Sequence, residues 1–304
     1  MDVDAVVGER GWATRAELLG RISARTLSTW VTGGRLVRVQ PGVFATPAAA
    51  RRWRVRVAAA LAGRDAVASH GTALALWELV PPPAGPVHLT VEDGRSARGS
   101  AGVVVHRNSR ACTDRRRVTG LPVTSVERAV VDAWGSPAPP SRAEVRAAAI
   151  TAVARRLCRP ADLARELAVS IRVPQRAQLA TLVGLLADGC RSELEIWGCT
   201  HVLRAPGMPA FVQQRRVTVG GRTFVLDAAY EEAMLAVEMD GAAWHGSSRQ
   251  RESDIRRDSL LATVGWQTLR FSYRRLTGDP QACRRDVLAV YETRRRVLRG
   301  DGVR

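Results

Sequence analysis

The sequence contains no lysine, so its 46 basic residues are all arginine. Against 29 acidic residues they leave a formal net charge of +17, which indicates a polyanionic partner such as nucleic acid. An all-arginine composition is also typical of a GC-rich genome, so the charge alone leaves DNA binding and compositional bias equally open. From Cys190 onward, 19 arginines against 14 acidic residues give +5, so the other +12 belongs to the first 189 residues.

Other absences narrow the class of protein. The five cysteines include no C-x-x-C pair, which favours reduced, buried thiols in a cytoplasmic protein over a disulfide framework or a zinc site. No apolar run is long enough to span a membrane, and the acidic start MDVDAVVGERGW is unlike a secretory signal peptide. A hydrophobic content of 46% is nevertheless sufficient for proper cores.

The length of 304 residues and the changes of pattern along the chain predict a mixed α/β protein of several parts. The turn-rich stretch SPAPPS, Ser136 to Ser141, is the clearest break. The expected parts are a winged helix-turn-helix at 1–48, a mixed α+β region at 49–135, a linker and helical bridge at 136–189, and a domain with an α-β-β-β-α-β core at 190–304.

The first 45 residues have the pattern of two helices followed by a hairpin. A capping-box pattern at Thr14 and Glu17 predicts one helix start, and Ser23 is expected to cap a second helix. The segment RLVRVQPGVFAT then alternates around a Pro-Gly turn, as a two-stranded wing does. In such a unit the second helix enters the major groove and wing arginines contact phosphate, whereas the alternative is a packing unit without a ligand. The side chains expected to contact DNA are Arg25, Thr26, Thr29, Arg35 and Arg38.

Four segments, WATRAELL, ARTLSTWVTGGRLVRVQPGVFAT, ASHGTALALWEL and GLPVTSVERAVVDAW, resemble the N-terminal region of AbiEi-type antitoxins. The resemblance implies a transcriptional regulator of a toxin–antitoxin operon, with a cognate toxin as a partner. Within the same region, PVHLTVEDG and GVVVHRN are expected to form a hairpin. We interpret His70, His88 and His106 as packing or hydrogen-bonding residues rather than metal ligands.

The last third of the chain places several acids inside apolar strand patterns. In the strand that ends at Asp240, Leu235, Val237 and Met239 alternate with Glu238 and Asp240, so the two acids share a face. A short turn makes the preceding strand an antiparallel neighbour, which is expected to bring Asp227 beside Glu238.

Clustered carboxylates need a partner, because two of them about 4 Å apart repel by roughly 4 kcal/mol at an effective dielectric near 20. The hard oxygen ligands of Asp227, Glu238 and Asp240 suit Mg²⁺ or Mn²⁺, which would remove the repulsion. The alternative is a solvated face of an edge strand, paired with Arg256, Arg257 or Arg270.

The ordered pieces RSELE, VLDAAY, AVEMDGAAWH, SDIRRDSLLATVGW and LRF resemble the Vsr-like group of the PD-(D/E)XK nucleases, known as domain of unknown function 559. The resemblance implies a restriction-endonuclease-like fold in which Asp227 and Glu238 bind the metal and Glu195 is the acid of the leading helix. His245 matches the histidine after the acidic strand, where it is expected to act as a general base or to polarise the attacking water. Asp240 stands where many members of the superfamily carry a lysine, although an acid there is usual in the Vsr-like group.

Three more charged residues lie near this motif. Asp254 and Arg257 share one helix with Asp258, and intrahelical ion pairs are the simpler interpretation, with phosphate or site contacts as the alternative. Arg270 alternates with Leu269 and Phe271 and is a candidate to point toward the site.

The sequence thus predicts a metal-dependent DNA endonuclease with an N-terminal DNA-binding module. The competing hypothesis is a non-catalytic AbiEi-like regulator that carries a nuclease-like scaffold, and an RNA substrate is a third possibility. The target sequence, the number of metal ions, a repair partner and the oligomeric state stay open.

Overall fold

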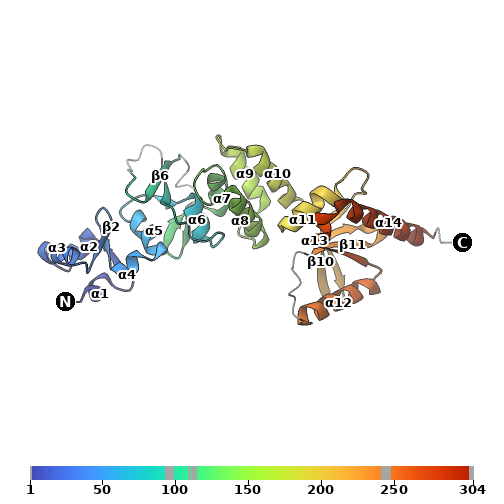
Figure 1. Ribbon diagram of the computed structural model, residues 1–304, viewed down its shortest axis with the longest axis horizontal. Coiled ribbons are helices and arrows are strands. Elements are labelled where there is room, and N and C mark those ends of the chain that lie inside the picture. The colour runs from blue at the N-terminus through green and yellow to red at the C-terminus, as the bar shows by residue number, and fades with distance from the viewer. Residues whose placement is uncertain (1, 93–98, 109, 111–114, 241–247, 301–304) are drawn as a thin grey trace. The chain divides into compact units, whose positions relative to one another are not determined.

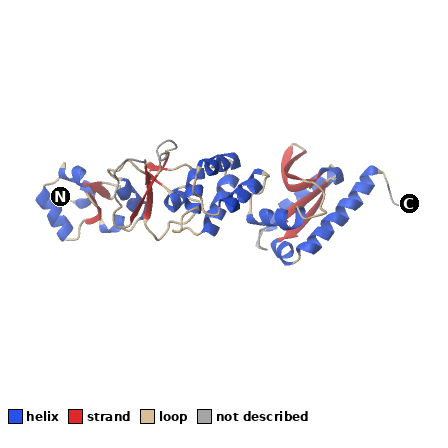
Figure 2. Cartoon of the chain, turned by 90° about the horizontal axis from the view of Figure 1, so that it is seen from above, coloured by secondary structure: helices blue, strands red, loops and turns tan. Residues whose placement is uncertain are grey.

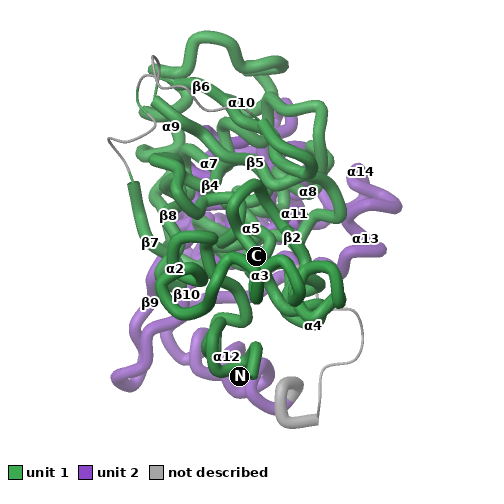
Figure 3. The backbone as a smooth tube through the Cα atoms, turned by 90° about the vertical axis from the view of Figure 1, so that its left-hand side faces the viewer, with its two compact units in different colours: residues 1–180 green, residues 181–304 purple. Residues whose placement is uncertain are grey.

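The computed structural model describes residues 2–92, 99–108, 110, 115–240 and 248–300, and of residues 240 and 248–251 it describes the backbone alone. The chain divides into two compact units, 1–180 and 181–304 (Figure 3). Helices and strands together form a mixed α/β arrangement (Figures 1 and 2). No helix among the described residues is both long enough and apolar enough to cross a membrane.

Unit 1 begins with a small sheet of strand order β1-β3-β2 and three short helices. Its elements are α1 (Val3–Val7), β1 (Trp12–Thr14), α2 (Arg15–Leu19), α3 (Ala24–Thr32), β2 (Val37–Gln40) and β3 (Val43–Ala45). The capping box expected at Thr14 and Glu17 is present, and the Ser23 side chain accepts a hydrogen bond from the Thr26 amide at the start of α3. Leu27 and Trp30 of α3 are buried in the core of this region, which holds the helix against the sheet.

The next part of unit 1 is a five-stranded sheet of order β6-β5-β4-β8-β7. Its elements are α4 (Pro47–Ala50), α5 (Trp53–Leu61), β4 (Val67–Ala68), α6 (His70–Leu76), β5 (Val87–Val91), β6 (Val103–Arg107), β7 (Arg116–Val118), β8 (Leu121–Val123) and α7 (Val126–Trp134). The hairpin expected from β5 and β6 is wrong, because these strands are parallel. The connection from Glu92 to Gly102 is longer than a hairpin turn of two to five residues, and parallel strands require such a longer connection.

Helices complete unit 1 and lead into unit 2. They are α8 (Arg142–Ala154), α9 (Pro160–Val169) and α10 (Arg176–Ala187). Ser141 and Glu144 form a second capping box at the start of α8, directly after the break expected at SPAPPS.

Unit 2 is a four-stranded sheet of order β12-β11-β10-β9 with helices on both faces. Its elements are α11 (Glu193–Gly198) with a π-helical turn (Cys199–Leu203), β9 (Val212–Val219), β10 (Arg222–Tyr230), a 3₁₀ turn (Glu231–Ala233), β11 (Leu235–Asp240), α12 (Ser248–Thr263), β12 (Gln267–Ser272), α13 (Tyr273–Gly278) and α14 (Pro280–Arg299). This order matches the expected one, with α13 as an addition. Gly220 and Gly221 both have positive φ, which is what the tight turn between β9 and β10 requires.

The two faces of this sheet are covered by different helices (Figure 1). On one face, Leu261 of α12 packs with Leu226 and Ala236. On the other, Gly198 of α11 lies so close to Met239 that a Cβ there would overlap the Met239 sulfur. β11 therefore lies between two strands and between two helical layers.

Candidate active site

The expected site lies where β10 and β11 stop pairing. Their antiparallel register runs from Tyr230↔Leu235 to Ala228↔Val237. One residue further on, the Met239 amide donates to the Asp227 carboxylate (N–Oδ2 3.0 Å). The half-buried Asp227 side chain thus lies at the junction of the two strands.

Glu238 is the most deeply buried acid of this region, with 5% of its surface exposed. Burial, followed by the neighbouring charge of Asp227, raises the pKa of its carboxyl from 4.5 to about 7, against the opposing effects of Arg257 and Arg270. Arg257 of α12 is its partner, with Nη2 2.8 Å from Glu238 Oε1 and 2.6 Å from the Val225 carbonyl oxygen. The solvated edge-strand alternative is therefore wrong for Glu238, although its ion pair with Arg257 is present.

Glu195 approaches the same region from α11. It is 9% exposed, and burial together with the charge of Asp227 raises the pKa of its carboxyl. The Arg191 amide donates to its Oε2 at 2.9 Å, and the Gln214 side chain lies 3.4 Å from the same oxygen. Glu195, Asp227 and Glu238 thus come from three elements into one electrostatically connected group, because Asp227 raises the pKa of both glutamates.

The charged residues of α12 reach across to the sheet instead of along their own helix. Arg257 binds Glu238 of β11, and Asp258 accepts two hydrogen bonds from Arg270 of β12 at 2.9 and 3.1 Å. The interpretation as intrahelical pairs is therefore wrong for Arg257 and Asp258. In the parallel pair β11–β12, Arg270 is the direct register partner of Glu238, which places it beside the site. Asp254, on the same helix, contributes to the raised pKa of Arg270 through its charge.

Two expected site residues lie at or beyond the limit of the description. Asp240 is the last residue of β11 and aligns with Ser272 of β12, but its side chain is not among those described. His245 falls within 241–247, outside the described residues.

The described acids of this region do not form a compact set of metal ligands. Within the described residues, the one group of three or more potential ligands whose atoms all lie within 4.8 Å of one another is made of histidines in unit 1. Glu195, Asp227 and Glu238 are therefore spaced more widely, as mutual repulsion requires. Arg257 supplies the positive charge next to Glu238.

Comparisons with known proteins bear on this segment. Residues 209–290 match the family REase_MTES_1575, a restriction-endonuclease-like family, and the match covers Asp227, Glu238 and Arg257. The C-terminal domain is restriction-endonuclease-like. The match thus confirms the general type of domain that was expected there.

Two uncharacterized proteins of Mycobacterium tuberculosis, MT2308 of strain CDC 1551 / Oshkosh and Rv2248 of strain ATCC 25618 / H37Rv, are each 27% identical to this chain over 251 residues. The alignments cover 81% of this chain and 88% of each relative. The crystal structure of the RV2827C protein from the same species is 18% identical, with a TM-score of 0.43, and covers 60% of this chain and 75% of its own.

The side chains expected to contact DNA are mostly on the surface of unit 1. Arg25, Thr29, Arg35 and Arg38 are exposed. Thr26 is half-buried and its hydroxyl bonds to Ser23 Oγ at 2.9 Å, so it belongs to the helix cap instead of an open surface. Arg35 also lies over the Trp30 ring at 5.2 Å, which holds its guanidinium near the end of α3.

Two features of the site were absent from the sequence expectations. Gln214 of β9 reaches Glu195, and the neighbouring Gln213 side chain lies 3.1 Å from both the Cys190 and the Cys199 sulfurs. The pair of glutamines in QQRR was a visible signal, since consecutive polar residues interrupt the strand alternation there. Among the described cysteines, Cys158, Cys190, Cys199 and Cys283 are free and buried, as expected for reduced thiols.

Proposed function

We propose that unit 2 is a metal-dependent endonuclease that hydrolyses phosphodiester bonds in DNA. The observation that carries the proposal is that the charge of Asp227, where β10 and β11 stop pairing, acts on two buried acids, Glu195 and Glu238, inside a restriction-endonuclease-like domain. Burial makes the charged form of a carboxylic acid unfavourable and raises its pKa. Groups with such shifted pKa values occur preferentially at functional sites.

The donor set suits a hard divalent cation. Asp227, Glu238 and Asp240 would hold Mg²⁺ or Mn²⁺, whose preferred ligands are carboxylate oxygens. Such an ion supplies positive charge for the phosphoryl oxygens and activates the attacking water. The fit is supported by the raised pKa values of Glu238 and Glu195, because a cation would offset the burial and the repulsion by Asp227 that raise them.

The remaining residues have positioning and charge roles in this proposal. Glu195 accepts a hydrogen bond from the Arg191 amide, which fixes its carboxylate toward Asp227. Arg257, which pairs with Glu238, and Arg270, which is held by Asp258, would supply positive charge for a phosphate oxygen of the substrate. Asp254 supports Arg270 electrostatically, and His245 accepts the proton of the attacking water.

Cleavage assays with matched variants test the nuclease. Purified full-length protein is incubated with supercoiled, linear, mismatched and single-stranded DNA, and with RNA, in Mg²⁺ or Mn²⁺. Glu238→Gln removes the buried carboxylate at nearly constant volume and is expected to reduce cleavage by at least about a hundredfold, the usual scale for a lost electrostatic contact in a site. Glu252→Gln changes an exposed acid of α12 in the same way and is expected to retain full activity.

Two results would contradict the nuclease. One is wild-type protein that cleaves none of these substrates with either metal, and the other is Glu238→Gln protein that cleaves as fast as wild type. Cleavage of RNA but not of DNA would support the proposed active site and show that its substrate is RNA.

A second candidate is a non-catalytic regulator, the function implied by the resemblance of the N-terminal region to AbiEi-type antitoxins. The observation that favours it is the ion pair between Arg257 and Glu238, because a site that is permanently closed by its own arginine needs no metal. In that case the protein binds operator DNA, binds a cognate toxin and cleaves nothing.

Both candidates include DNA binding by the N-terminal unit, through Arg25, Thr29, Arg35 and Arg38, with Thr26 as part of the helix cap. Arg25→Ala and Arg38→Ala are each expected to weaken DNA binding about three- to tenfold and to reduce the slope of log affinity against log salt by about 1. Arg165→Ala, which removes an exposed arginine of α9, is the matched control and is expected to change neither. Equal effects of all three substitutions would place the interface elsewhere.

A further inference from the structure

Three of the five histidines meet in unit 1, far in sequence from the acids of unit 2. His70 is the first residue of α6, His88 lies on β5 and His106 on β6. In the parallel register His88 pairs with Val104 and Thr90 with His106, so the two strand histidines share a face two positions apart. Their interpretation as separate packing residues did not foresee this cluster.

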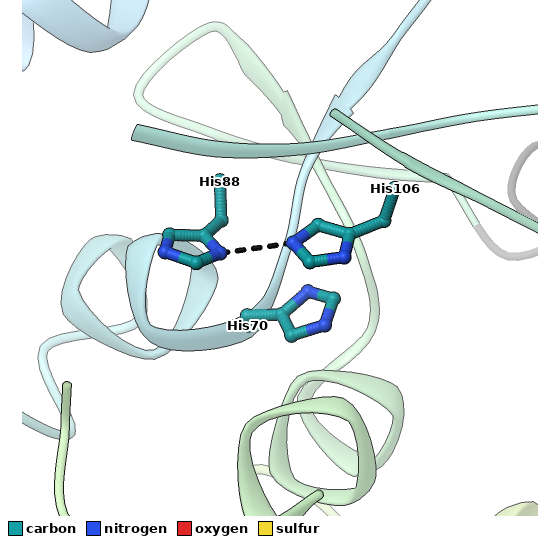
Figure 4. Close-up of side chains that lie close together, drawn as sticks. All are labelled: His70, His88 and His106. Atoms are coloured by element: carbon teal, nitrogen blue, oxygen red, sulfur yellow. Dashed lines mark hydrogen bonds between the residues drawn. The ribbon is translucent and has the colours of Figure 1, made fainter. Parts of the chain in front are cut away.

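The ring nitrogens converge closely. One nitrogen of each ring lies within 4.8 Å of the other two, and His88 Nδ1 is 2.9 Å from His106 Nε2 (Figure 4). A metal bound to two imidazoles at about 2.0–2.1 Å holds their nitrogens roughly 3.3 Å apart in tetrahedral geometry. The two strand rings are thus within a few tenths of an ångström of a shared-ligand arrangement.

The backbone of the third histidine, His70, has an unfavourable conformation. His70 has a φ of +52°, in the left-handed region that residues other than glycine rarely adopt. Its Nδ1 lies 3.0 Å from the Ser69 hydroxyl. If that nitrogen carries the proton, Nε2 keeps its lone pair, which is how partners of a ligand histidine select the coordinating atom.

Balanced ion pairs and a buried hydroxyl group surround the histidine cluster. Arg110 and Arg128 both bind Glu166, and Arg128 also binds Asp132, so these two positive and two negative charges cancel near the cluster. Within the described part of the chain, the hydroxyl of Thr90, 2% exposed and in register with His106, is one of the buried polar atoms without a hydrogen-bond partner. A buried polar atom of this kind requires an explanation, and a ligand in the cluster would supply one.

The cluster is also open on one side. His70 and His106 line a cavity of about 760 Å³ whose walls include Arg107, Asn108 and Asp132. Three histidines with a fourth position facing solvent are the arrangement of an open zinc site, in contrast to a closed structural site with four protein ligands.

We infer that His70, His88 and His106 form a binding site for a divalent transition metal of the Zn²⁺ class, with its fourth position directed into this cavity. Imidazole nitrogens suit Zn²⁺ and Co²⁺, whereas the hard Mg²⁺ proposed for unit 2 prefers oxygen. The His70 ring stacks on the His106 ring, with centroids 3.8 Å apart and planes 21° apart. Coordination turns the His70 ring so that its lone pair points toward the metal.

Metal binding to the whole chain tests the inference directly. Protein stripped with a chelator is titrated with Zn²⁺ against a chromogenic chelator and with Co²⁺ by visible absorption. We expect one equivalent of submicromolar Zn²⁺ per chain, a tetrahedral Co²⁺ spectrum, and imidazole nitrogen ligands in X-ray absorption. Absence of submicromolar Zn²⁺ binding to the wild type, or a ligand set without histidine, would overturn the inference.

Variants then locate the metal. His70→Asn suits the positive φ, and His106→Gln keeps a polar side chain of similar length. Each is expected to weaken Zn²⁺ binding at least about a hundredfold, exceeding the 10–100-fold typical of losing a mere supporting contact. His201→Gln, which changes an exposed histidine stacked on Trp197, is expected to bind Zn²⁺ as the wild type does.

Circular dichroism of the metal-free proteins checks that each variant is folded. If His106→Gln is unfolded, His70→Asn and the wild-type X-ray absorption decide. Wild-type affinity in folded His70→Asn and His106→Gln, or loss of binding in His201→Gln, would place the metal elsewhere and contradict the assignment.

Discussion

The acid group of unit 2 and the histidine cluster of unit 1 bury titratable side chains by opposite means. Glu238 is 5% exposed and is paired with Arg257 at 2.8 Å. His88 is similarly buried, at 4%, yet its partner is another imidazole. A carboxylate needs a counter-charge or a proton inside a protein, whereas an imidazole loses its charge at neutral pH at little cost. Burial therefore leaves a charged partner beside the acid and a stack of neutral rings beside the histidine.

The largest expected effect comes from removing the counter-charge of Glu238. Arg257→Met is expected to lower the free energy of unfolding of metal-free protein by about 3 kcal/mol at pH 8, because it leaves a buried charge unpaired. At pH 6 the loss is smaller, since Glu238, with a pKa of about 7, takes up a proton. Urea unfolding at the two pH values measures the difference.

Arg256→Met is the matched control for this substitution, because Arg256 is an exposed neighbour on the same helix. It is expected to change stability by less than about 0.5 kcal/mol at either pH. Similar losses in both variants would mean that the ion pair does not support the acid group.

Two glycines allow the packing beside each region to be compared. A Cβ at Gly71, next to His70, would overlap the Pro140 ring and approach the Pro139 carbonyl oxygen at 2.7 Å. A Cβ at Gly198, on the helix that carries Glu195, would overlap only the side chain of Met239. Because a proline ring and a backbone oxygen cannot move aside as a methionine can, we expect Gly71→Ala to cost about 3 kcal/mol and Gly198→Ala about 1 kcal/mol.

Gly184→Ala in α10 serves as the control for both glycines, since nothing lies within 4 Å of the added Cβ. It is expected to be neutral or to stabilise by up to about 1 kcal/mol, the helix preference of alanine over glycine. Denaturant midpoints rank the three variants, and a larger loss in Gly198→Ala than in Gly71→Ala would reverse the comparison.

The smallest effect is a pH dependence of opposite sign in the two units. His70 has a folded pKa near 2, below its ordinary 6.5, so the unfolded chain binds the proton more readily and unit 1 loses stability as the pH falls below 6.5. Glu238 has a folded pKa of about 7, above its ordinary 4.5, so its contribution is greatest at low pH and is lost as the pH rises from 4.5 through 7.

Each of these groups changes stability by roughly 1 kcal/mol per pH unit within its window. Amide hydrogen exchange of α6 and β11 between pH 5 and 8, corrected for intrinsic rates, measures the two slopes separately. His70→Asn is expected to flatten the first slope and Glu238→Gln the second. Slopes of the same sign would contradict the contrast between neutral imidazoles and charged acids.

Much of the local structure could be predicted from the sequence. The caps at Thr14 and Ser23, the turn at Gly220-Gly221 and the succession of helices and strands along unit 2 follow from signals that act over a few residues. The expectation that Asp227 lies beside Glu238 rests on signals of the same kind, because they lie on strands joined by a short turn and alternation predicts which side chains share a face.

Contacts between distant segments could not be predicted in this way. Asp258 was expected to pair on its own helix, but α12 packs on the sheet and directs this side chain to Arg270 of β12. The pair of Arg257 with Glu238 had appeared only as one of several alternatives. The parallel pairing of β5 and β6 depends on the path of a long connection, which periodicity does not encode.

By itself, then, the sequence determined which residues could carry chemistry and which strands would present the acids, since both depend on residue type and short-range alternation. Only the tertiary structure decided which side chains those residues contact and how their pKa values shift. Three histidines separated by 18 residues each became one cluster because α6, β5 and β6 pack together. The pKa of Glu238 is set by burial and by residues from neighbouring elements, and burial is a property of the packed chain, not of its order.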